Sequence, residues 1–182
     1  MSHVCCAIGL GGNLGDAPGT LTQALHDLAA LQDSRIIAVS GLYRSAAIGP
    51  AGQPDYANAV IALETGLSPW HLLDALQSLE TGAGRVRDIR WGARTLDLDL
   101  LLYGNHAIND ARLTVPHREI QHRAFVLRPL QDIWPHAHWS DALDLVTLLQ
   151  QPAIAQQTLG PWPEPRWTAA REQYSRHLWS TS

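Results

Sequence analysis

Two aspartates stand in an otherwise apolar run of the chain, at positions 97 and 99. Side chains alternate between the two faces of a β-strand, so Asp97 and Asp99 are predicted to point the same way, about 6.6–7 Å apart along the strand. Two carboxylates on one face can bind one hard cation or bridge two. The alternative is a solvent-facing strand with incidental acids. Aspartate is depleted in strands, which favours a metal site.

An arginine-rich segment, residues 84–94, directly precedes the two aspartates. It holds four arginines within ten residues, together with Trp91 and flanking glycines. Arginines beside paired carboxylates suggest a metal-polyphosphate site, in which guanidinium groups neutralise the phosphate charge that the metal does not. A basic loop that pairs with surface acids is the alternative. A third cluster, residues 112–125, adds three arginines, two histidines and a phenylalanine.

Several common phosphate-binding devices are excluded by composition. All 13 basic residues other than histidine are arginines, so the chain holds no lysine. A P-loop, the strand lysine of protein kinases and the Schiff-base lysine of pyridoxal phosphate enzymes are therefore absent. The glycine-rich turn at residues 9–15 lacks the third glycine of a dinucleotide fingerprint, because Leu14 occupies that position. Phosphate is expected to be bound by arginine, histidine, backbone amides or metal.

The 182 residues and net charge of -4 are typical of one ordinary globular domain. Seven of the 13 arginines nevertheless lie between positions 85 and 123, on both sides of the aspartates. Adjacent Cys5 and Cys6 have poor geometry for a disulfide and indicate a reducing compartment. No signal peptide or membrane-spanning run is visible. We therefore expect a cytoplasmic protein without membrane or nucleic-acid partners.

The elements that must position these residues are predicted in the order βαββαβ. Apolar runs predict strands at residues 4–10, 35–43, 56–63 and 96–103. Leucines at helical spacing predict one helix after Asp16 and a second after Ser68, each with a proline near its start. This order is that of a ferredoxin-like α+β sandwich, an antiparallel sheet with helices packed on one face.

C-terminal additions are expected beyond this sandwich. Short edge strands are predicted within residues 108–115 and helices over 124–133 and 141–150, the latter capped by Ser140. Residues 1–159 are predicted to form the catalytic domain. Residues 160–182, with their prolines and tryptophans, are predicted to be an irregular extension of that domain on its surface.

These segments resemble those of a known family. The resemblance covers residues 7–16, 42–45 with 49–50, 53–59, 84–87 with 90–99, and 113–125. The sequence is similar to the 6-hydroxymethyl-7,8-dihydropterin pyrophosphokinase family, most specifically in the run Arg90-Trp91-Gly92-Ala93-Arg94 that leads to the paired aspartates. The resemblance implies Mg²⁺-dependent transfer of pyrophosphate from ATP to the hydroxymethyl group of the pterin. The products would be the pterin diphosphate and AMP, in folate biosynthesis.

The resemblance also implies roles for individual residues. Asp97 and Asp99 would bind two Mg²⁺ ions, with Arg85 and Arg94 as further catalytic residues. On the pterin side, Tyr56 and Phe125 would sandwich the ring and Asn58 would read its hydrogen-bonding edge, with Ser45, Ile48 and Trp91 nearby. The ATP side would comprise Gln77, Glu80, Arg87, Trp91, Arg94, Arg112, Thr114, His117, Arg118 and Arg123. The loop that bears Arg85 and Arg87 resembles a lid.

Two other functions stay open at this point. A non-catalytic relative would bind ATP or pterin without turnover. A metal-dependent phosphohydrolase would use the acids and arginines but would leave Tyr56, Asn58 and Phe125 without a role. The sequence identifies no general base, and we expect a monomer that acts on two small molecules.

Overall fold

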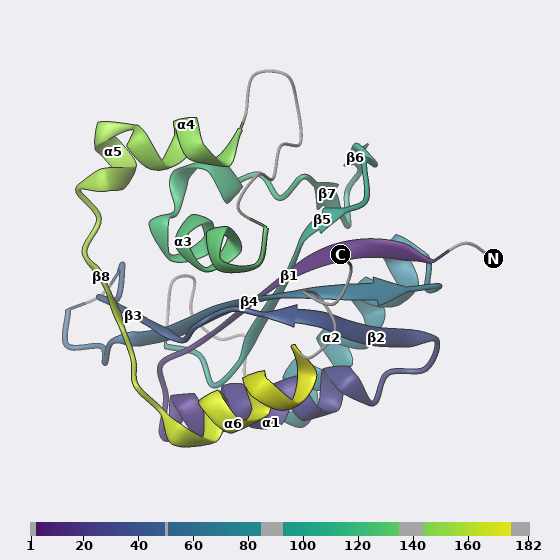
Figure 1. Ribbon diagram of the computed structural model, residues 1–182, viewed down its shortest axis with the longest axis horizontal. Coiled ribbons are helices and arrows are strands. Elements are labelled where there is room, and N and C mark those ends of the chain that lie inside the picture. Colours follow the sequence, from purple (N-terminus) through teal and green to yellow (C-terminus); the bar gives the residue numbers. More distant parts are fainter. Residues whose placement is uncertain (1–2, 50, 85–92, 135–143, 176–182) are drawn as a thin grey trace, which may run out of the picture.

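The computed structural model describes residues 3–49, 51–84, 93–134 and 144–175. Figure 1 shows a central sheet with helices on both sides of it. The elements in chain order are β1 (Val4–Gly12), α1 (Ala17–Ala29), β2 (Ser34–Val39), β3 (Tyr43–Ser45), β4 (Tyr56–Thr65), α2 (Pro69–Gly82), β5 (Asp97–Tyr103), β6 (Ile108–Asn109), β7 (Thr114–Val115), a 3₁₀ turn (Ile120–His122), α3 (Ala124–Ile133), α4 (Leu145–Gln150), α5 (Pro152–Ala155), β8 (Leu159–Pro161) and α6 (Pro165–Tyr174).

The main sheet is antiparallel throughout the part of the chain that the structure describes. Its order is β5-β1-β4-β3-β8, with β2 also paired to β4. The predicted βαββαβ order is confirmed, and the fold is the expected ferredoxin-like sandwich with additions. The short strands predicted within 108–115 exist, but β6 and β7 pair with each other in a separate sheet.

The single strand predicted over residues 35–43 is divided in two. β2 and β3 lie along the same edge of β4, and the chain leaves the strand conformation between them. At this break the Ser40 hydroxyl accepts a 2.9 Å hydrogen bond from the Val60 amide, and the Ser40 amide donates to the Val60 carbonyl at 3.0 Å. A side chain thus replaces one group of the backbone ladder, which permits a new register in β3.

The two helices of the predicted sandwich, α1 and α2, lie on one face of the sheet as expected, and the added helices α3, α4 and α5 cover the opposite face. One apolar cluster contains residues of α1, α2 and α6, among them Leu21, Leu76 and Trp167 respectively. α3, α4 and α5 share another with the opposite face of β1, β4 and β5, where Ala7 and Val60 are fully buried. The sequence of β4 is apolar along most of its length, without alternating polar and apolar residues, as expected for a strand that is covered on both faces.

The first two helices begin where the sequence predicts. The Asp16 carboxylate accepts a hydrogen bond from the Gly19 amide at 3.1 Å, and the Ser68 hydroxyl accepts one from the His71 amide at 3.3 Å. Proline lies in the first turn of each helix, where its missing N–H costs nothing. Both helices direct leucines into the core, so capping and periodicity agree.

The C-terminal part of the chain is more ordered than predicted. α3 has the predicted bounds, but α4 begins at Leu145 with Asp144 as its cap and not at the predicted residue 141, while the predicted cap Ser140 lies outside the described residues. Residues 160–175 are not irregular, because β8 joins the sheet and α6 packs on α1. The boundary placed between residues 159 and 160 falls inside β8. Within the described ranges, no helix is both long and apolar enough to cross a membrane.

Candidate active site

A pocket opens where β1, β3, β4 and β5 meet the first turn of α3. Gly9 and Gly11 of β1 contribute backbone to its wall, and the other strands contribute side chains of both kinds, charged and aromatic. Five of the predicted pterin-side residues line it: Ser45, Ile48, Tyr56, Asn58 and Phe125. Four residues predicted for catalysis, metal or ATP also line it: Arg94, Asp97, Asp99 and Arg123. The structure therefore brings the two predicted sides together in one cavity.

The charged wall is built on β5. Asp97 and Asp99 both face the pocket, as the strand alternation predicted, while Leu98 and Leu100 enter the core. Nη1 of Arg94 lies 2.5 Å from Oδ2 of Asp97 in a half-buried ion pair. This pairing holds an arginine directly beside the two acids, as a site for a polyphosphate requires.

The surroundings of Asp99 disfavour the charged form of its carboxyl. Burial raises the pKa of its carboxyl, and the charge of Asp97 raises it further, against the opposing effects of His117, Arg123 and Arg94. The histidine Nε2 and the Arg123 Nη1 are 3.9 and 4.0 Å from the two Asp99 oxygens, too long for hydrogen bonds. An additional cation at the pocket would relieve this repulsion.

The backbone between the two acids is tied to α2. Glu80 is 3% exposed, and its Oε1 accepts a 2.7 Å hydrogen bond from the amide of Leu98. Glu80 was predicted on the ATP side, but it lies beneath β5 and does not line the pocket. Its carboxylate can therefore fix the position of the β5 backbone that carries Asp97 and Asp99.

The rest of the pocket lining combines flat apolar surface with an oriented amide. Tyr56 and Phe125 contribute rings, and Ile48, 67% exposed, lies at the rim. Asn58 is buried, and its Nδ2 donates to the Ser45 hydroxyl at 2.9 Å and to the Tyr56 carbonyl at 3.2 Å. A carbonyl can only accept, so these bonds assign the amide orientation and leave Oδ1 as the acceptor available to a ligand.

Asn13 supports the site, although the sequence interpretation gave it no role. It is 2% exposed, and its Oδ1 accepts a 2.8 Å hydrogen bond from the amide of Arg94. Its Nδ2 donates to the carbonyl of Pro54 at 3.0 Å. One side chain thus joins the segments that lead to Asp97 and to Tyr56. The sequence shows Asn13 directly after the glycine pair of the turn. Its hydrogen-bond partners, Pro54 and Arg94, are 41 and 81 residues away in the chain, so no local pattern indicates them.

Other predicted site residues lie elsewhere. Arg85, Arg87 and Trp91 fall outside the described residues. His117 lies near Asp99 without lining the pocket, and Arg112 forms an ion pair with Asp74 of α2. The remaining three also lie outside the pocket lining: Gln77 on α2, Thr114 on β7 and the exposed Arg118.

Comparison with known proteins shows a consistent similarity. The sequence profile of the family described as 7,8-dihydro-6-hydroxymethylpterin-pyrophosphokinase matches residues 7–135. A Pseudomonas aeruginosa protein named 2-amino-4-hydroxy-6-hydroxymethyldihydropteridine pyrophosphokinase is 49% identical over 142 residues, which are 78% of this chain and 88% of that protein. A Haemophilus influenzae protein of the same name is 49% identical over 126 residues, 69% of this chain and 79% of that protein.

Among solved structures, wild-type Plasmodium falciparum HPPK-DHPS with SDX-DHP superposes with a TM-score of 0.63 at 14% identity. The match covers 80% of this chain and 44% of that one, so the chain spans less than half of the longer protein. At this identity the likeness concerns the fold alone. It agrees with the ferredoxin-like arrangement described above.

Proposed function

This chain belongs to the 7,8-dihydro-6-hydroxymethylpterin-pyrophosphokinase family and is therefore a diphosphotransferase, and from that premise we propose its reaction. It transfers pyrophosphate from ATP to the hydroxymethyl group of 6-hydroxymethyl-7,8-dihydropterin in folate biosynthesis. The products are the pterin diphosphate and AMP. The enzyme acts as a cytoplasmic monomer on these two small molecules.

One observation carries the proposal: a single pocket is lined both by acids and arginines and by two rings and an amide. A phosphohydrolase would need only the first set of residues, and a simple heterocycle-binding module only the second. Pyrophosphoryl transfer to a pterin alcohol needs both, because donor phosphate and acceptor hydroxyl must lie within near-attack distance.

The pterin occupies the wall of rings. Tyr56 and Phe125 stack on its two faces, which suits a flat uncharged heterocycle. Asn58 accepts a hydrogen bond from the edge of the ring through Oδ1, since Nδ2 is already used by Ser45 and Tyr56. Ile48 covers the ring at the pocket rim, and Trp91 belongs to the same side by resemblance.

The chemistry of the acid wall fits Mg²⁺. Both donors are carboxylates, the oxygen ligands that this cation prefers. In the described residues no group of three or more histidine, cysteine or acidic side chains could hold a metal, so phosphate and water would complete the coordination of ions at Asp97 and Asp99. When bound, two Mg²⁺ ions supply positive charge to the ATP phosphates and to the transferred group.

The chain's own residues supply positioning and charge. Arg94 and Arg123 face the pocket and neutralise the phosphates, and His117 approaches from the side of Asp99. The remaining ATP contacts come from Gln77, Arg87, Trp91, Arg112, Thr114 and Arg118, and Arg85 acts late as part of the arginine loop. Glu80, predicted on this side, acts through the backbone of β5. Exclusion of water by this loop favours transfer to the pterin over hydrolysis. No side chain is assigned as a general base.

The nucleotide product tests the proposal. Purified protein is mixed with ATP, MgCl₂ and the pterin alcohol, and the nucleotides are separated by chromatography. AMP formed in equal amount with pterin diphosphate is the expected result. ADP would contradict pyrophosphoryl transfer, ATP breakdown without pterin would indicate a phosphohydrolase, and binding without turnover would indicate a non-catalytic relative.

A further inference from the structure

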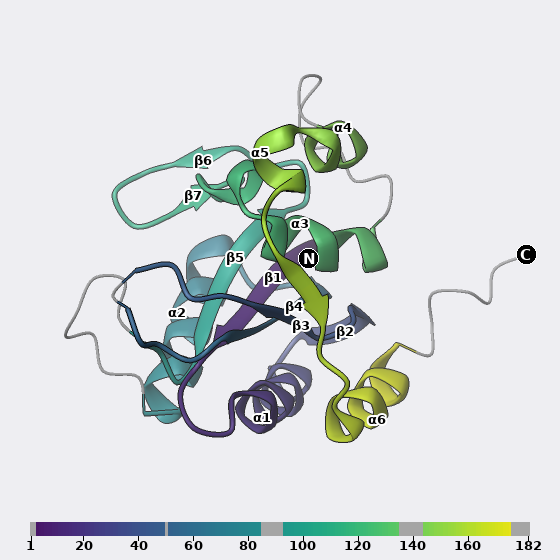
Figure 2. The same ribbon diagram turned by 90° about the vertical axis from the view of Figure 1, so that its left-hand side faces the viewer.

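The C-terminal segment, residues 159–175, lies against the strand that brings Ser45 into the pocket. The family match ends at residue 135, so it assigns this segment no role. β8 pairs with β3, with Leu159 opposite Ser45 and Gly160 opposite Arg44. β3 is thereby enclosed between β4 and β8, as Figure 2 shows, and does not form an edge of the sheet.

The segment also satisfies the backbone that leads into β3. The indole Nε1 of Trp167 donates to the carbonyl oxygen of Ser40 at 3.0 Å. The amide of Trp162 donates to the carbonyl oxygen of Leu42 at 2.8 Å. These carbonyls belong to the break between β2 and β3, where the chain is not in a strand conformation. Trp167 is 2% exposed, so its hydrogen bond is made in the core.

Two further contacts fix the flanks of this break. Nε of Arg171 donates to the carbonyl oxygen of Val39 at 3.0 Å. The guanidinium of Arg44, in β3 itself, lies 4.2 Å from the ring centroid of Trp162 in a cation-π arrangement. The C-terminal segment therefore contacts the chain before, within and beside β3.

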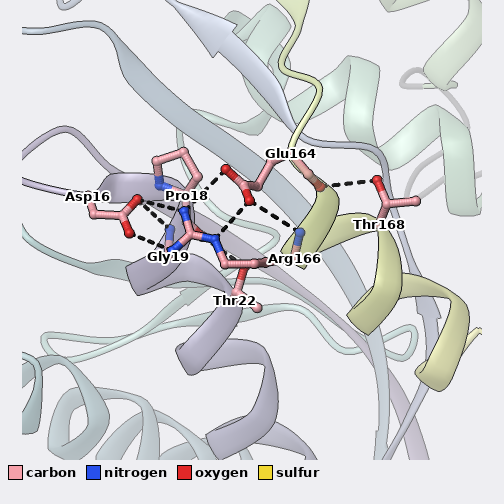
Figure 3. A network of polar contacts seen from close by, with 7 residues as sticks. All are labelled: Asp16, Pro18, Gly19, Thr22, Glu164, Arg166 and Thr168. Carbon is pink, nitrogen blue, oxygen red and sulfur yellow. Dashed lines mark hydrogen bonds and ion pairs between the residues drawn. The ribbon is translucent and has the colours of Figure 1, made fainter.

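α6 is itself attached firmly to the body of the protein. Figure 3 shows the Arg166 guanidinium between Asp16, the cap of α1, and Glu164, the cap of α6. Its Nη1 and Nη2 lie 2.6 and 3.0 Å from the two Asp16 oxygens, and its Nε lies 2.8 Å from Glu164. At the other end of α6, the Tyr174 hydroxyl is 2.7 Å from Nδ1 of His26.

Ser45 links the C-terminal segment to the pocket, because it lies on β3 and its hydroxyl accepts a hydrogen bond from Nδ2 of Asn58. We propose that the C-terminal segment is a brace that fixes β3 and thereby positions Ser45 and Asn58 for the pterin. The inference rests on the proposed function for the identity of the ligand. Asp97 and Asp99 lie on β5, which pairs with neither β3 nor β8, so the ATP side is expected to be independent of the brace.

The physical need for a brace follows from the length of β3. The strand has three residues and is followed by the loop that carries Ile48. A strand this short, paired on one side only, opens easily. Ordering it on substrate binding would consume part of the binding free energy, and a strand already held by β8 and Trp167 avoids that cost.

The test compares full-length variants. Trp167→Phe removes the indole donor and keeps most of the buried ring. Arg171→Met removes the donor to Val39, and Arg171→Lys retains a donor. Trp70→Phe, which loses an indole hydrogen bond to Asp110 on the exposed surface, is the matched control. Leu28→Ala, in the core but outside the pocket lining, controls for lost stability.

Two readouts are measured on each variant: the KM for pterin and for ATP from AMP formation, and hydrogen exchange of the amides of residues 43–45. Trp167→Phe and Arg171→Met should raise the pterin KM about three- to tenfold, with the ATP KM within twofold of wild type. They should accelerate exchange at residues 43–45 by a similar factor. Arg171→Lys should lie closer to wild type, Trp70→Phe should match wild type in both readouts, and Leu28→Ala should match it in pterin KM.

The outcomes separate the two proposals. An unchanged pterin KM or unchanged exchange in Trp167→Phe would overturn the brace, as would an equal rise in pterin KM in Leu28→Ala. Absence of AMP formation by the wild-type protein would instead overturn the proposed function. The brace proposal would then be tested by the rate of hydrogen exchange at the amides of residues 43–45 alone, a measurement that requires no substrate.

Discussion

The amide of Leu98, the residue between the two pocket aspartates, donates its hydrogen bond to the buried carboxylate of Glu80, 18 residues earlier in the chain. A strand at this position would otherwise offer that amide to a neighbouring strand or to water. The bond from α2 fixes β5 at the point where it turns both acids toward the pocket. Glu80 therefore acts on the site through the backbone, whatever contact it makes with nucleotide.

Replacement of Glu80 should separate these effects. Glu80→Ala leaves a buried amide without a partner and should lower the free energy of unfolding by about 1–3 kcal/mol. It should also lower kcat at least about tenfold through displaced aspartates. Glu80→Gln keeps an acceptor and should retain more of both. The free energy of unfolding is measured by urea denaturation and kcat by AMP formation. Ser78→Ala, on the exposed face of α2, is the control. Equal behaviour of the Ala and Gln variants would contradict the backbone role.

Removal of one pocket acid should abolish most of the activity. Asp97→Ala deletes a proposed Mg²⁺ ligand and leaves Arg94 without its 2.5 Å partner, so kcat should fall at least about 10³-fold. The rate of AMP formation is measured across a range of MgCl₂ concentrations. Asp27→Asn, on α1 away from the pocket, should keep wild-type kcat and metal dependence. Wild-type turnover in Asp97→Ala would refute the metal assignment.

Loss of the Phe125 ring should affect one substrate only. Phe125→Leu keeps apolar volume but removes the aromatic face, and the pterin KM should rise about three- to tenfold. Phe125→Tyr retains the ring and should stay near wild type. The ATP KM should change less in both, although Arg123 lies 5.6 Å over the same ring. A larger effect on ATP than on pterin would place the nucleotide on this wall instead.

Local signals in the sequence predicted much of the fold. Asp16 and Ser68 cap the helices that follow them, and leucine spacing identified the buried faces. The alternation of Asp97 and Asp99 predicted their common face, which the pocket confirms. Each of these features depends on residues within a few positions of one another, where periodicity and capping are decisive.

Features that depend on distant partners were not predicted. Trp167 was expected at the surface because its surroundings are rich in proline, yet its indole is buried against Ser40, 127 residues earlier. The division of the strand over 35–43 follows from the Ser40 side chain, and the roles of Asn13 and Glu80 follow from backbone groups on other elements. Nothing in the local pattern specifies such long-range hydrogen bonds.

The Asp16-Arg166-Glu164 cluster predicts how stability depends on pH. Hydrogen bonds from Arg166 hold the pKa of Asp16 and of Glu164 below their ordinary values of 3.8 and 4.5. A depressed folded-state pKa contributes stability above the unfolded-state pKa, and that contribution is lost as the pH falls through the folded-state value. The cluster should therefore stabilise the protein above about pH 4.5 and lose this contribution below about pH 4.

Arg166→Gln removes the cause of both shifts and should weaken the acid dependence of stability. The free energy of unfolding is measured by urea denaturation between pH 7 and pH 3. The variant should be less stable than wild type at pH 7, and the difference should shrink as the pH falls toward 3, because the unfolded chain then binds protons that the lowered pKa values of Asp16 and Glu164 keep off the folded wild type. Arg35→Gln, which breaks the exposed pair with Glu64, is the matched control for the removal of a surface arginine. A difference between Arg166→Gln and wild type that is constant with pH would show that Arg166 stabilises α6 by packing and not through its carboxylate partners.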